Sequence, residues 1–261
     1  IKKLILKYNF DVIFHLGAIT QVIDSFKSPI KAYKTNIMGT INICESIRLL
    51  NKKIILIYSS SDKAYGEMSK LQYIENDRLQ GQFPYDVSKS SSDLLCQSYS
   101  LTYDLKIGIV RSGNIFGPGD FNLDRLIPGT IVETIKNKNI VIRSNGKLRR
   151  DYIYVEDVAR GYEKLMNKMF KSKSKLHIYN LGSKYNYNAL EVVMGIYRIM
   201  RKKNLRPIVK NLFTDYEIKN QKLSYKKAKV ELNWNPTISF DKGIRKTIQW
   251  YKKNINEFKT T

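Results

Sequence analysis

The chain has 261 residues, of which 43% are hydrophobic and 26% charged, a balance typical of a globular protein with a substantial core. It contains no run of about 18 apolar residues that could span a membrane, and its first residues lack the charged-then-apolar pattern of a signal peptide. We therefore expect a cytoplasmic protein without a membrane span. The formal net charge of +23 raises the question of an anionic partner.

Lysine and arginine are spread along the whole chain, mostly on the polar side of helical patterns. Nucleic-acid binding would be indicated by clustered cations or by a recognition motif. Because neither is present, we interpret the charge as a solvated surface and expect no nucleic-acid partner, although a basic binding protein stays open as an alternative. A positive field would equally attract a small anion such as a sugar diphosphate.

The two cysteines, Cys44 and Cys96, fall on the apolar side of helical patterns. They have no CxxC spacing and no neighbouring histidine cluster, which a metal or redox site would need. We interpret both as reduced core residues and expect no metal. His15 ends an apolar strand, so a structural role is favoured over a catalytic one there.

The first half of the chain alternates short apolar runs with longer segments that have apolar residues at helical spacing. Elements of these lengths in alternation predict a doubly wound parallel sheet. The expected elements are a strand at Asp11–His15, a helix at Pro29–Leu50, a strand at Lys53–Tyr58, a helix at Tyr85–Tyr103 and a strand at Lys106–Val110.

After Arg111 the composition changes, because residues 112–128 are rich in glycine, proline and asparagine and form a loop long enough to be functional. A second set of alternating elements follows, and the apolar stripe of its last helix indicates core packing. These elements are helix Ile127–Lys136, strands Ile140–Arg143 and Asp151–Val155, a helix capped by Asp157 and ending near Met169, strand His177–Leu181, helix Leu190–Met200, strand Ile208–Leu212 and a helix from about Asp241.

The segment from Ser59 to Lys89 carries the most interpretable chemistry. Tyr85 and Lys89 are four residues apart, so in a helix opened by Pro84 they share a face, and the lysine would depress the phenol pKa from about 10. We expect Ser59–Lys63 on the loop after the preceding strand, where open α/β sheets bind their ligands. The two ends of the segment are therefore expected to converge on one substrate.

Seven segments in chain order resemble the extended short-chain dehydrogenases/reductases, the NAD-dependent epimerase/dehydratase family that acts on nucleotide sugars. SDKAYG, END at 75–77 and PYDVSK resemble the CDP-glucose 4,6-dehydratase-like members in particular. The segments are HLGAITQVIDSFKSPIKAYKTNIMGTINICESIR, SSSDKAYGE, PYDVSK, RSGNIFGPGD, RLIPGTI, RRDYIYVEDVA and YNLGS.

The resemblance implies a Rossmann-like doubly wound parallel sheet whose N-terminal strands are missing, with a smaller interleaved α/β substrate-binding domain. Residues 1–114 would form the partial NAD-binding domain, with a return strand near 177–182. Residues 115–261 would mainly bind the nucleotide sugar. The helices at about 31–50 and 85–103 would pair with those of a second copy in a homodimer.

The resemblance also implies a lyase of deoxysugar and polysaccharide biosynthesis with a defined mechanism. Tyr85 would take the proton of the sugar C4 hydroxyl while a hydride passes to NAD, with Lys89 lowering the tyrosine pKa and Ser61 sharing the hydrogen bond. Asp62 would be the acid for the C6 hydroxyl, and Lys63 would take part at C5. The hydride then returns to C6, so NAD is not consumed.

Binding roles follow from the same resemblance. Leu16, Gly17, Ala18 and Ser59 would contact NAD together with Tyr85 and Lys89, and small residues at the first three positions would let the cofactor approach the backbone. The substrate, a nucleotide-diphosphate sugar, would be held by Asn114, Arg125 and Arg150. Simpler interpretations are a surface ion pair for the neighbours Asp62 and Lys63 and an ordinary helical pair for Tyr85 and Lys89.

The sequence departs from this pattern at its start, where the strand and glycine fingerprint of a dinucleotide-binding fold are absent. We therefore expect a fragment, with weak or no binding of NAD and an exposed sheet edge. A C4 or C2 epimerase of the same family, which needs no acid and base at C5 and C6, is the first alternative. A non-catalytic fragment or basic binding protein is the second.

Overall fold

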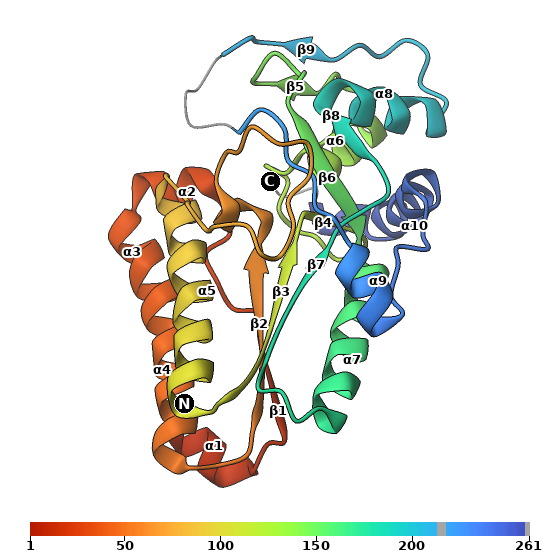
Figure 1. Cartoon of the computed structure of the whole chain (residues 1–261). Helices are drawn as coiled ribbons and strands as arrows, with labels where there is room; N and C mark the ends of the chain where they lie inside the picture. Colours follow the sequence, from red (N-terminus) through yellow and green to blue (C-terminus); the bar gives the residue numbers. More distant parts are fainter. Residues whose placement is uncertain (213–217, 259–261) are drawn as a thin grey trace.

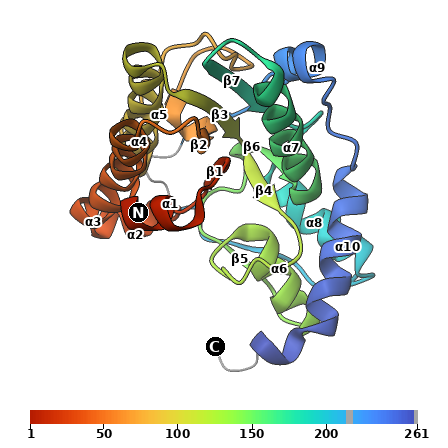
Figure 2. The ribbon, with the colours of Figure 1, turned by 90° about the horizontal axis from the view of Figure 1, so that it is seen from below.

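A four-stranded parallel sheet forms the centre of the computed structural model, which describes residues 1–212 and 218–258. The strand order is β1-β2-β3-β7, and all neighbouring pairs are parallel (Figures 1 and 2). The carboxyl ends of the strands therefore meet on one edge of the sheet. The strands are β1 (Val12–His15), β2 (Ile55–Ser61), β3 (Lys106–Ser112) and β7 (Leu176–Leu181).

Helices cover both faces of this sheet, and the alternation of residues along β2 explains why (Figure 1). Leu56 and Tyr58 pack in one apolar core with both cysteines, which are buried and free as predicted, whereas Ile55 and Ile57 pack in another. The first face carries α1 (Lys2–Tyr8), α3 (Pro29–Tyr33), a π-helical turn (Lys34–Met38), α4 (Gly39–Leu50) and α5 (Pro84–Tyr103), and the second carries α7 (Val155–Lys171) and α9 (Lys226–Leu232).

A second lobe is built on a three-stranded sheet in the order β4-β6-β8, in which β6 pairs in parallel with β4 and antiparallel with β8. Its helices share a separate apolar core. The elements are β4 (Asn114–Phe116), α6 (Leu126–Ile135), β5 (Val141–Ile142), β6 (Arg149–Tyr154), β8 (Asn186–Asn188), α8 (Ala189–Ile199), β9 (Ile208–Val209), α10 (Phe240–Lys253) and a 3₁₀ turn (Ile255–Phe258).

The predicted class, a parallel α/β sheet with helices on both faces, is confirmed, and most predicted elements lie within a few residues of their expected bounds. In the part of the chain that is described, β1 is one of the two outer strands of this sheet, and Phe14 on it is 43% exposed. None of the described helices combines the length and apolar character needed to cross a membrane.

Two local predictions were wrong. The strand expected to end at Tyr58 continues to Ser61, because β3 extends to Ser112 and pairs with it residue by residue, so Ser59 lies within the strand. Asp157 does not cap its helix, which begins two residues earlier at Val155. A short helix, α2 (Val22–Lys27), was not predicted.

Candidate active site

The end of β2 presents three consecutive polar residues of the predicted site. Ser61 closes the strand and caps a 3₁₀ helix, η2 (Asp62–Tyr65), by accepting a hydrogen bond from the Lys63 amide at 3.2 Å. Its hydroxyl donates to the Asp62 carboxylate at 3.0 Å. Ser61 and Asp62 are both buried, whereas Lys63 is half-buried. Ser61 and Asp62 are therefore a fixed, desolvated pair, and burial of the Asp62 carboxylate does not fit a surface ion pair.

The first turn of α5 brings Tyr85 to the same place. Pro84 opens the helix as predicted, since its fixed φ suits the first helical positions. The Tyr85 phenol is buried, and burial raises its pKa, while a hydrogen bond with Ser61 and the charge of Arg125 act in the opposite direction. Tyr85, Ser61 and Asp62 thus converge on one point at the carboxyl end of the sheet.

Lys89 does not act on Tyr85 as predicted. Its ammonium donates to the backbone carbonyl of Ser59 at 2.8 Å and lies 5.3 Å from the centre of the Tyr58 ring. Burial lowers the Lys89 pKa to about 8. The expected depression of the Tyr85 pKa was wrong for this structure, because desolvation dominates and the long lysine side chain finds an acceptor on β2.

Two arginines reach this region from the second lobe. Arg150 on β6 donates to the Ile218 carbonyl at 2.6 Å, and its charge lowers the Asp62 pKa, which burial raises. Arg125, at the start of α6, contacts Asp120 and Thr20 at 3.2 Å each and lowers the Tyr85 pKa. The structure thus brings both predicted substrate arginines toward the buried acid and the tyrosine.

The turn after β1 is open. Leu16 and Gly17 are exposed, Ala18 is half-buried, and a Cβ on Gly17 would meet no atom within 4 Å. The predicted need for small residues there concerns a bound cofactor and stays a prediction. His15 is buried and lies 3.0 Å from the Thr40 hydroxyl, in the structural setting expected for it.

Sequence reasoning missed Asn36, which fastens the segment after this turn. Its side-chain amide exchanges hydrogen bonds with the Ile19 backbone at 2.8 and 3.0 Å and donates to the Ser88 hydroxyl at 2.9 Å. The segment is thereby tied to α5 beside Tyr85. The sequence showed only an asparagine within a helical pattern, which does not indicate the groups it bonds.

A network beneath the site joins the central strands to α5. Arg111 on β3 and Asp93 on α5 form a two-pronged ion pair at 2.8 and 2.9 Å, with both side chains at most 1% exposed. Ser60 donates to the same carboxylate at 2.6 Å, and Arg111 donates to the Tyr65 hydroxyl at 2.9 Å. This network holds the ends of β2 and β3 at a fixed distance from the helix that carries Tyr85.

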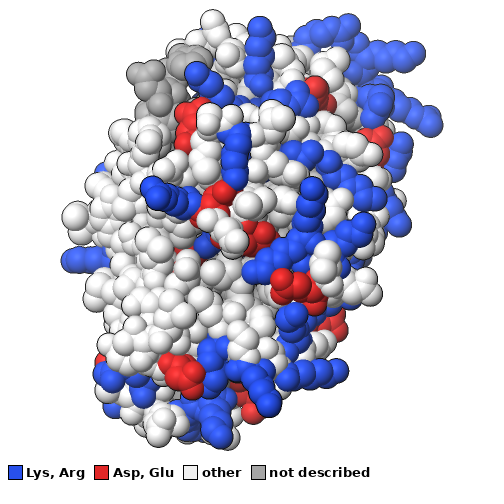
Figure 3. Space-filling model, in the orientation of Figure 1, with Lys and Arg blue, Asp and Glu red and all other residues white. Residues whose placement is uncertain are grey.

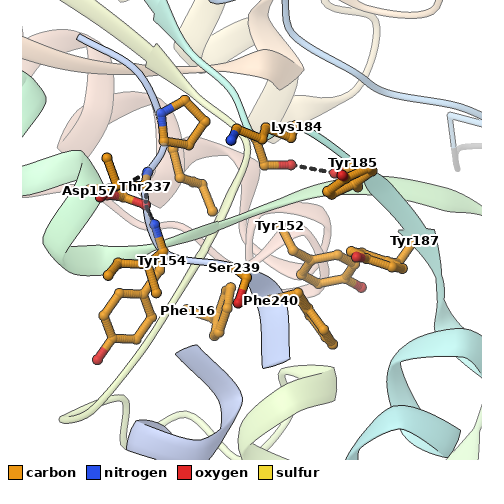
Figure 4. Close-up of a pocket in the computed structure, with 14 residues that line it drawn as sticks. Phe116, Tyr152, Tyr154, Asp157, Lys184, Tyr185, Tyr187, Thr237, Ser239 and Phe240 are labelled. Carbon is orange, nitrogen blue, oxygen red and sulfur yellow. Dashed lines mark hydrogen bonds between the residues drawn. The ribbon is translucent and has the colours of Figure 1, made fainter. Parts of the chain in front are cut away.

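A cavity of about 170 Å³ lies on one face of the three-stranded sheet (Figure 4). None of the predicted site residues lines it, but strand register places it beside them: Tyr152 is opposite Asn114, and Tyr187 is opposite Arg150. Aromatic side chains were not predicted as part of the site. Those around the cavity are Phe116, Tyr152, Tyr154, Tyr185, Tyr187 and Phe240.

Among the residues that the structure describes, no group of histidine, cysteine and carboxylate side chains could hold a metal ion. The end of β2 offers a phenol, a hydroxyl, buried carboxylates and a lysine. Such groups can move protons at a hydroxyl and at a carbon next to a carbonyl.

Comparison with known proteins places this arrangement in context. The family model described as GDP-mannose 4,6 dehydratase matches residues 1–247. A trifunctional UDP-glucose 4,6-dehydratase/3,5-epimerase/reductase of Arabidopsis thaliana is 28% identical, with a match over 96% of this chain and 37% of that protein. The dTDP-D-glucose 4,6-dehydratase of Dictyostelium discoideum is also 28% identical, with a match over 96% of this chain and 66% of that protein. The chain thus spans little more than a third of the length of the plant relative.

Solved structures share the fold. The dTDP-glucose 4,6-dehydratase of Bacillus anthracis, determined in complex with NAD, superimposes with a TM-score of 0.85 at 25% identity, covering 97% of this chain and 76% of that one. The UDP-glucose 4-epimerase of Thermotoga maritima, determined with UDP-glucose, superimposes with a TM-score of 0.88 at 24% identity. The match covers 97% of this chain and 81% of that one. Dehydratases and epimerases both occur among these neighbours.

Proposed function

The chain belongs to the GDP-mannose 4,6 dehydratase family, and from this premise we propose that it is an NAD-dependent nucleotide-sugar 4,6-dehydratase acting on a nucleoside-diphosphate glucose. The observation that carries the proposal is the buried Asp62, hydrogen-bonded to Ser61 and next to Tyr85. A C4 oxidation needs the serine and the tyrosine. Only a dehydration also needs an acid for the C6 hydroxyl.

The residues on this sheet edge fit one side of NAD. The open turn Leu16–Ala18 follows β1, Ser59 lies near the carboxyl end of the neighbouring strand β2, and the buried Lys89 on α5 donates to the Ser59 carbonyl. In such folds nucleotides bind at the carboxyl ends of the parallel strands. When bound, NAD supplies the hydride acceptor for C4 and the hydride donor for C6. Residues 1–114 and the strand near 177–182 are proposed as the cofactor side, and 115–261 as the substrate side.

The chain's own groups move the protons. Tyr85 takes the proton of the C4 hydroxyl, for which its pKa must come down. Burial and the charges of Asp62 and Asp86 raise that pKa, whereas the Ser61 hydrogen bond and the Arg125 charge lower it. Asp62 then protonates the C6 hydroxyl as it leaves. Burial raises the Asp62 pKa, which favours the protonated form that an acid requires. Lys63 takes part at C5.

Substrate binding is proposed for Asn114, Arg125 and Arg150. A planar guanidinium suits a diphosphate because its donors are paired, and Arg150 lies close enough to Asp62 to lower its pKa. The cavity beside Arg150 would extend this site along β6. We also propose a homodimer formed through α4 and α5, since both helices expose leucines.

An epimerase is the second candidate, because neighbours of the same fold catalyse 4-epimerisation. Incubation of the chain with NAD and dTDP-, UDP- or CDP-glucose, followed by mass spectrometry and NMR of the sugar, separates the two. Loss of one water and a 4-ketone are expected. Recovery of an isomer with unchanged mass would contradict the dehydratase proposal, and a thermal shift with NAD alone tests the cofactor.

Two variants locate the chemistry. Tyr85→Phe should slow reduction of NAD by the sugar by about 10²–10⁴-fold, whereas Asp62→Asn should retain reduction and lose dehydration. Tyr99→Phe, on the same helix with its hydroxyl bonded to Glu45 at 3.1 Å, is the matched control and should keep full activity. Equal losses in all three variants would argue against these roles.

A further inference from the structure

Lys89 carries a positive charge that is buried without a carboxylate partner. It is 4% exposed, and burial lowers its pKa only to about 8, so the amine is mostly charged at neutral pH. Asp93, one turn further along α5, is engaged in the two-pronged pair with Arg111. The ion pairs within 4 Å among the described residues do not include Lys89. A buried ammonium is costly unless other groups replace its water.

Two neighbouring residues of β2 replace that water. The Lys89 ammonium donates to the Ser59 carbonyl at 2.8 Å and lies 5.3 Å from the centre of the Tyr58 ring. A cation within about 6 Å of a ring centre is attracted by the negative face of the ring, and the attraction is stronger when both groups are desolvated. Both groups are desolvated here, since Tyr58 is 2% exposed.

The packing of α5 on β2 explains how lysine and ring meet. Lys89 and Asp93 are four residues apart and share one face of the helix. Asp93 accepts a hydrogen bond from Ser60 at 2.6 Å, so the preceding turn places Lys89 beside the preceding residues of the strand. The Tyr58 ring also contacts the His15 ring, with centres 5.5 Å apart, and a His15 pKa of about 4 keeps that neighbour neutral.

A simpler role for Tyr58 is to fill the core between β2 and α5. An aliphatic side chain would serve that purpose, as Leu56 does two residues earlier in the same apolar core. It would offer no negative face to the Lys89 ammonium, however, and the Ser59 carbonyl would be the one group left to replace the water of the charge. The contact with a buried cation therefore gives the ring a role beyond packing.

We propose, building on the proposed cofactor role of Lys89, that Tyr58 is a positioning residue: its ring and the Ser59 carbonyl hold the Lys89 ammonium from two sides. An ammonium has three N–H donors. The carbonyl takes one and the ring face a second, which leaves the third for an acceptor oxygen of the bound dinucleotide. Without the ring, the long lysine side chain would lose this fixed orientation.

The contact is tested first without cofactor, by NMR of the chain labelled with carbon-13 lysine. The Cε methylene signal of Lys89, identified by its loss in Lys89→Met, should be shifted upfield by the ring current of Tyr58. The shift should persist in Tyr58→Phe, which keeps the ring, and disappear in Tyr58→Leu. Tyr58→Met takes the place of the leucine variant if the latter does not fold.

Tyr179→Leu is the matched control for this measurement. It removes another buried ring of the same sheet, on β7, which lies 5.1 Å from the Lys227 ammonium. It should therefore shift the Lys227 signal and leave the Lys89 signal in place. A Lys89 signal that is the same in the wild type and in Tyr58→Leu would overturn the proposal.

A double-mutant cycle then tests whether Tyr58 acts through Lys89. Tyr58→Leu should weaken NAD binding, measured by calorimetry, by about 10-fold or more in the wild-type background. In the Lys89→Met background it should change binding by less than about twofold, because no ammonium is left to position.

A tyrosine that only filled the core would cost the same in both backgrounds, and this result would overturn the proposal. A loss in Tyr58→Phe as large as that in Tyr58→Leu would also overturn it. If the wild-type chain binds no NAD, the proposed cofactor function fails, whereas the lysine signals still decide whether Tyr58 positions Lys89.

Discussion

Desolvation decides the ionisation of the polar side chains that gather at the end of β2. It raises the pKa of Tyr85 and Asp86, and it lowers the pKa of Lys89 and His15. In each case the neutral form gains, because a charged group loses its water on burial. A spacing of four residues placed Lys89 and Tyr85 on one helix face, but the lysine side chain is long, and its nearest acceptor is a strand carbonyl.

His15 supplies a stability prediction at the residue scale. Burial, with the charge of Lys89 adding to it, lowers its pKa from 6.5 to about 4. Between these values the unfolded chain binds a proton that the folded chain does not, so stability should fall as pH decreases through this window. A shift of this size corresponds to about 3 kcal/mol. Urea titrations at a series of pH values should show that the free energy of unfolding decreases less with falling pH in His15→Gln than in the wild type.

The second histidine provides the comparison for this prediction. His177 is also buried, and its pKa is lowered in the same direction by burial and by Lys168. His177→Gln should remove a smaller part of the acid sensitivity, since its shift is smaller. Identical pH dependence in the wild type and His15→Gln would show that the folded chain takes up the proton without penalty.

Among the elements, α5 does more than carry Tyr85. Its buried face is unusually polar, with Ser88, Ser90, Ser92 and Asp93 all inside the protein. Ser92 bonds the Asn36 carbonyl at 3.0 Å, and Ser90 bonds the Ala64 carbonyl at 2.8 Å. These hydrogen bonds are directional, so they fix the orientation of the helix against the neighbouring segments. A purely apolar face would hold the helix by packing alone.

The buried pair between α5 and β3 gives the prediction at the scale of elements. Arg111→Met should lower the free energy of unfolding by about 3–5 kcal/mol, because it leaves the Asp93 carboxylate buried without its partner. Chemical denaturation followed by circular dichroism measures this.

The pair Arg198 and Asp241, with side chains 70% and 50% exposed, is the matched control, and Arg198→Met should cost under about 1 kcal/mol. The double variant Arg111→Met/Asp93→Leu should recover part of the loss. A loss under about 1 kcal/mol for Arg111→Met would show that the pair is dispensable.

At the scale of the whole molecule, the charge is less evenly distributed than the sequence suggests. On the face shown in Figure 3, many lysines and arginines lie on the side of α8, α9 and α10 and at the lower end, whereas the middle is largely uncharged. Acidic partners lie among them, as in Lys168 with Glu231 at 3.6 Å and Lys246 with Glu156 at 2.8 Å. These pairs neutralise part of the positive charge locally.

The proposed homodimer yields the whole-molecule prediction. Leu94 and Leu101, seven residues apart on α5, are 51% and 75% exposed, and Leu49 on α4 is 54% exposed. Because residues at this spacing share a helix face, Leu94→Glu/Leu101→Glu should convert a dimer to a monomer in sedimentation equilibrium. Val230→Glu, on α9 and 83% exposed, is the control and should stay dimeric. A monomeric wild type would contradict the proposal.

The sequence by itself determined the parallel α/β class, the position of most elements and the segment that carries the candidate site. These follow from periodicity, turn chemistry and local spacing, which depend on neighbours along the chain. Only the tertiary structure decided that Ser59 lies in a strand, that Lys89 turns to the Ser59 carbonyl and that Asp86 is buried in the first turn of α5. Strand ends, side-chain partners and desolvation depend on residues distant in sequence, so no local pattern could supply them.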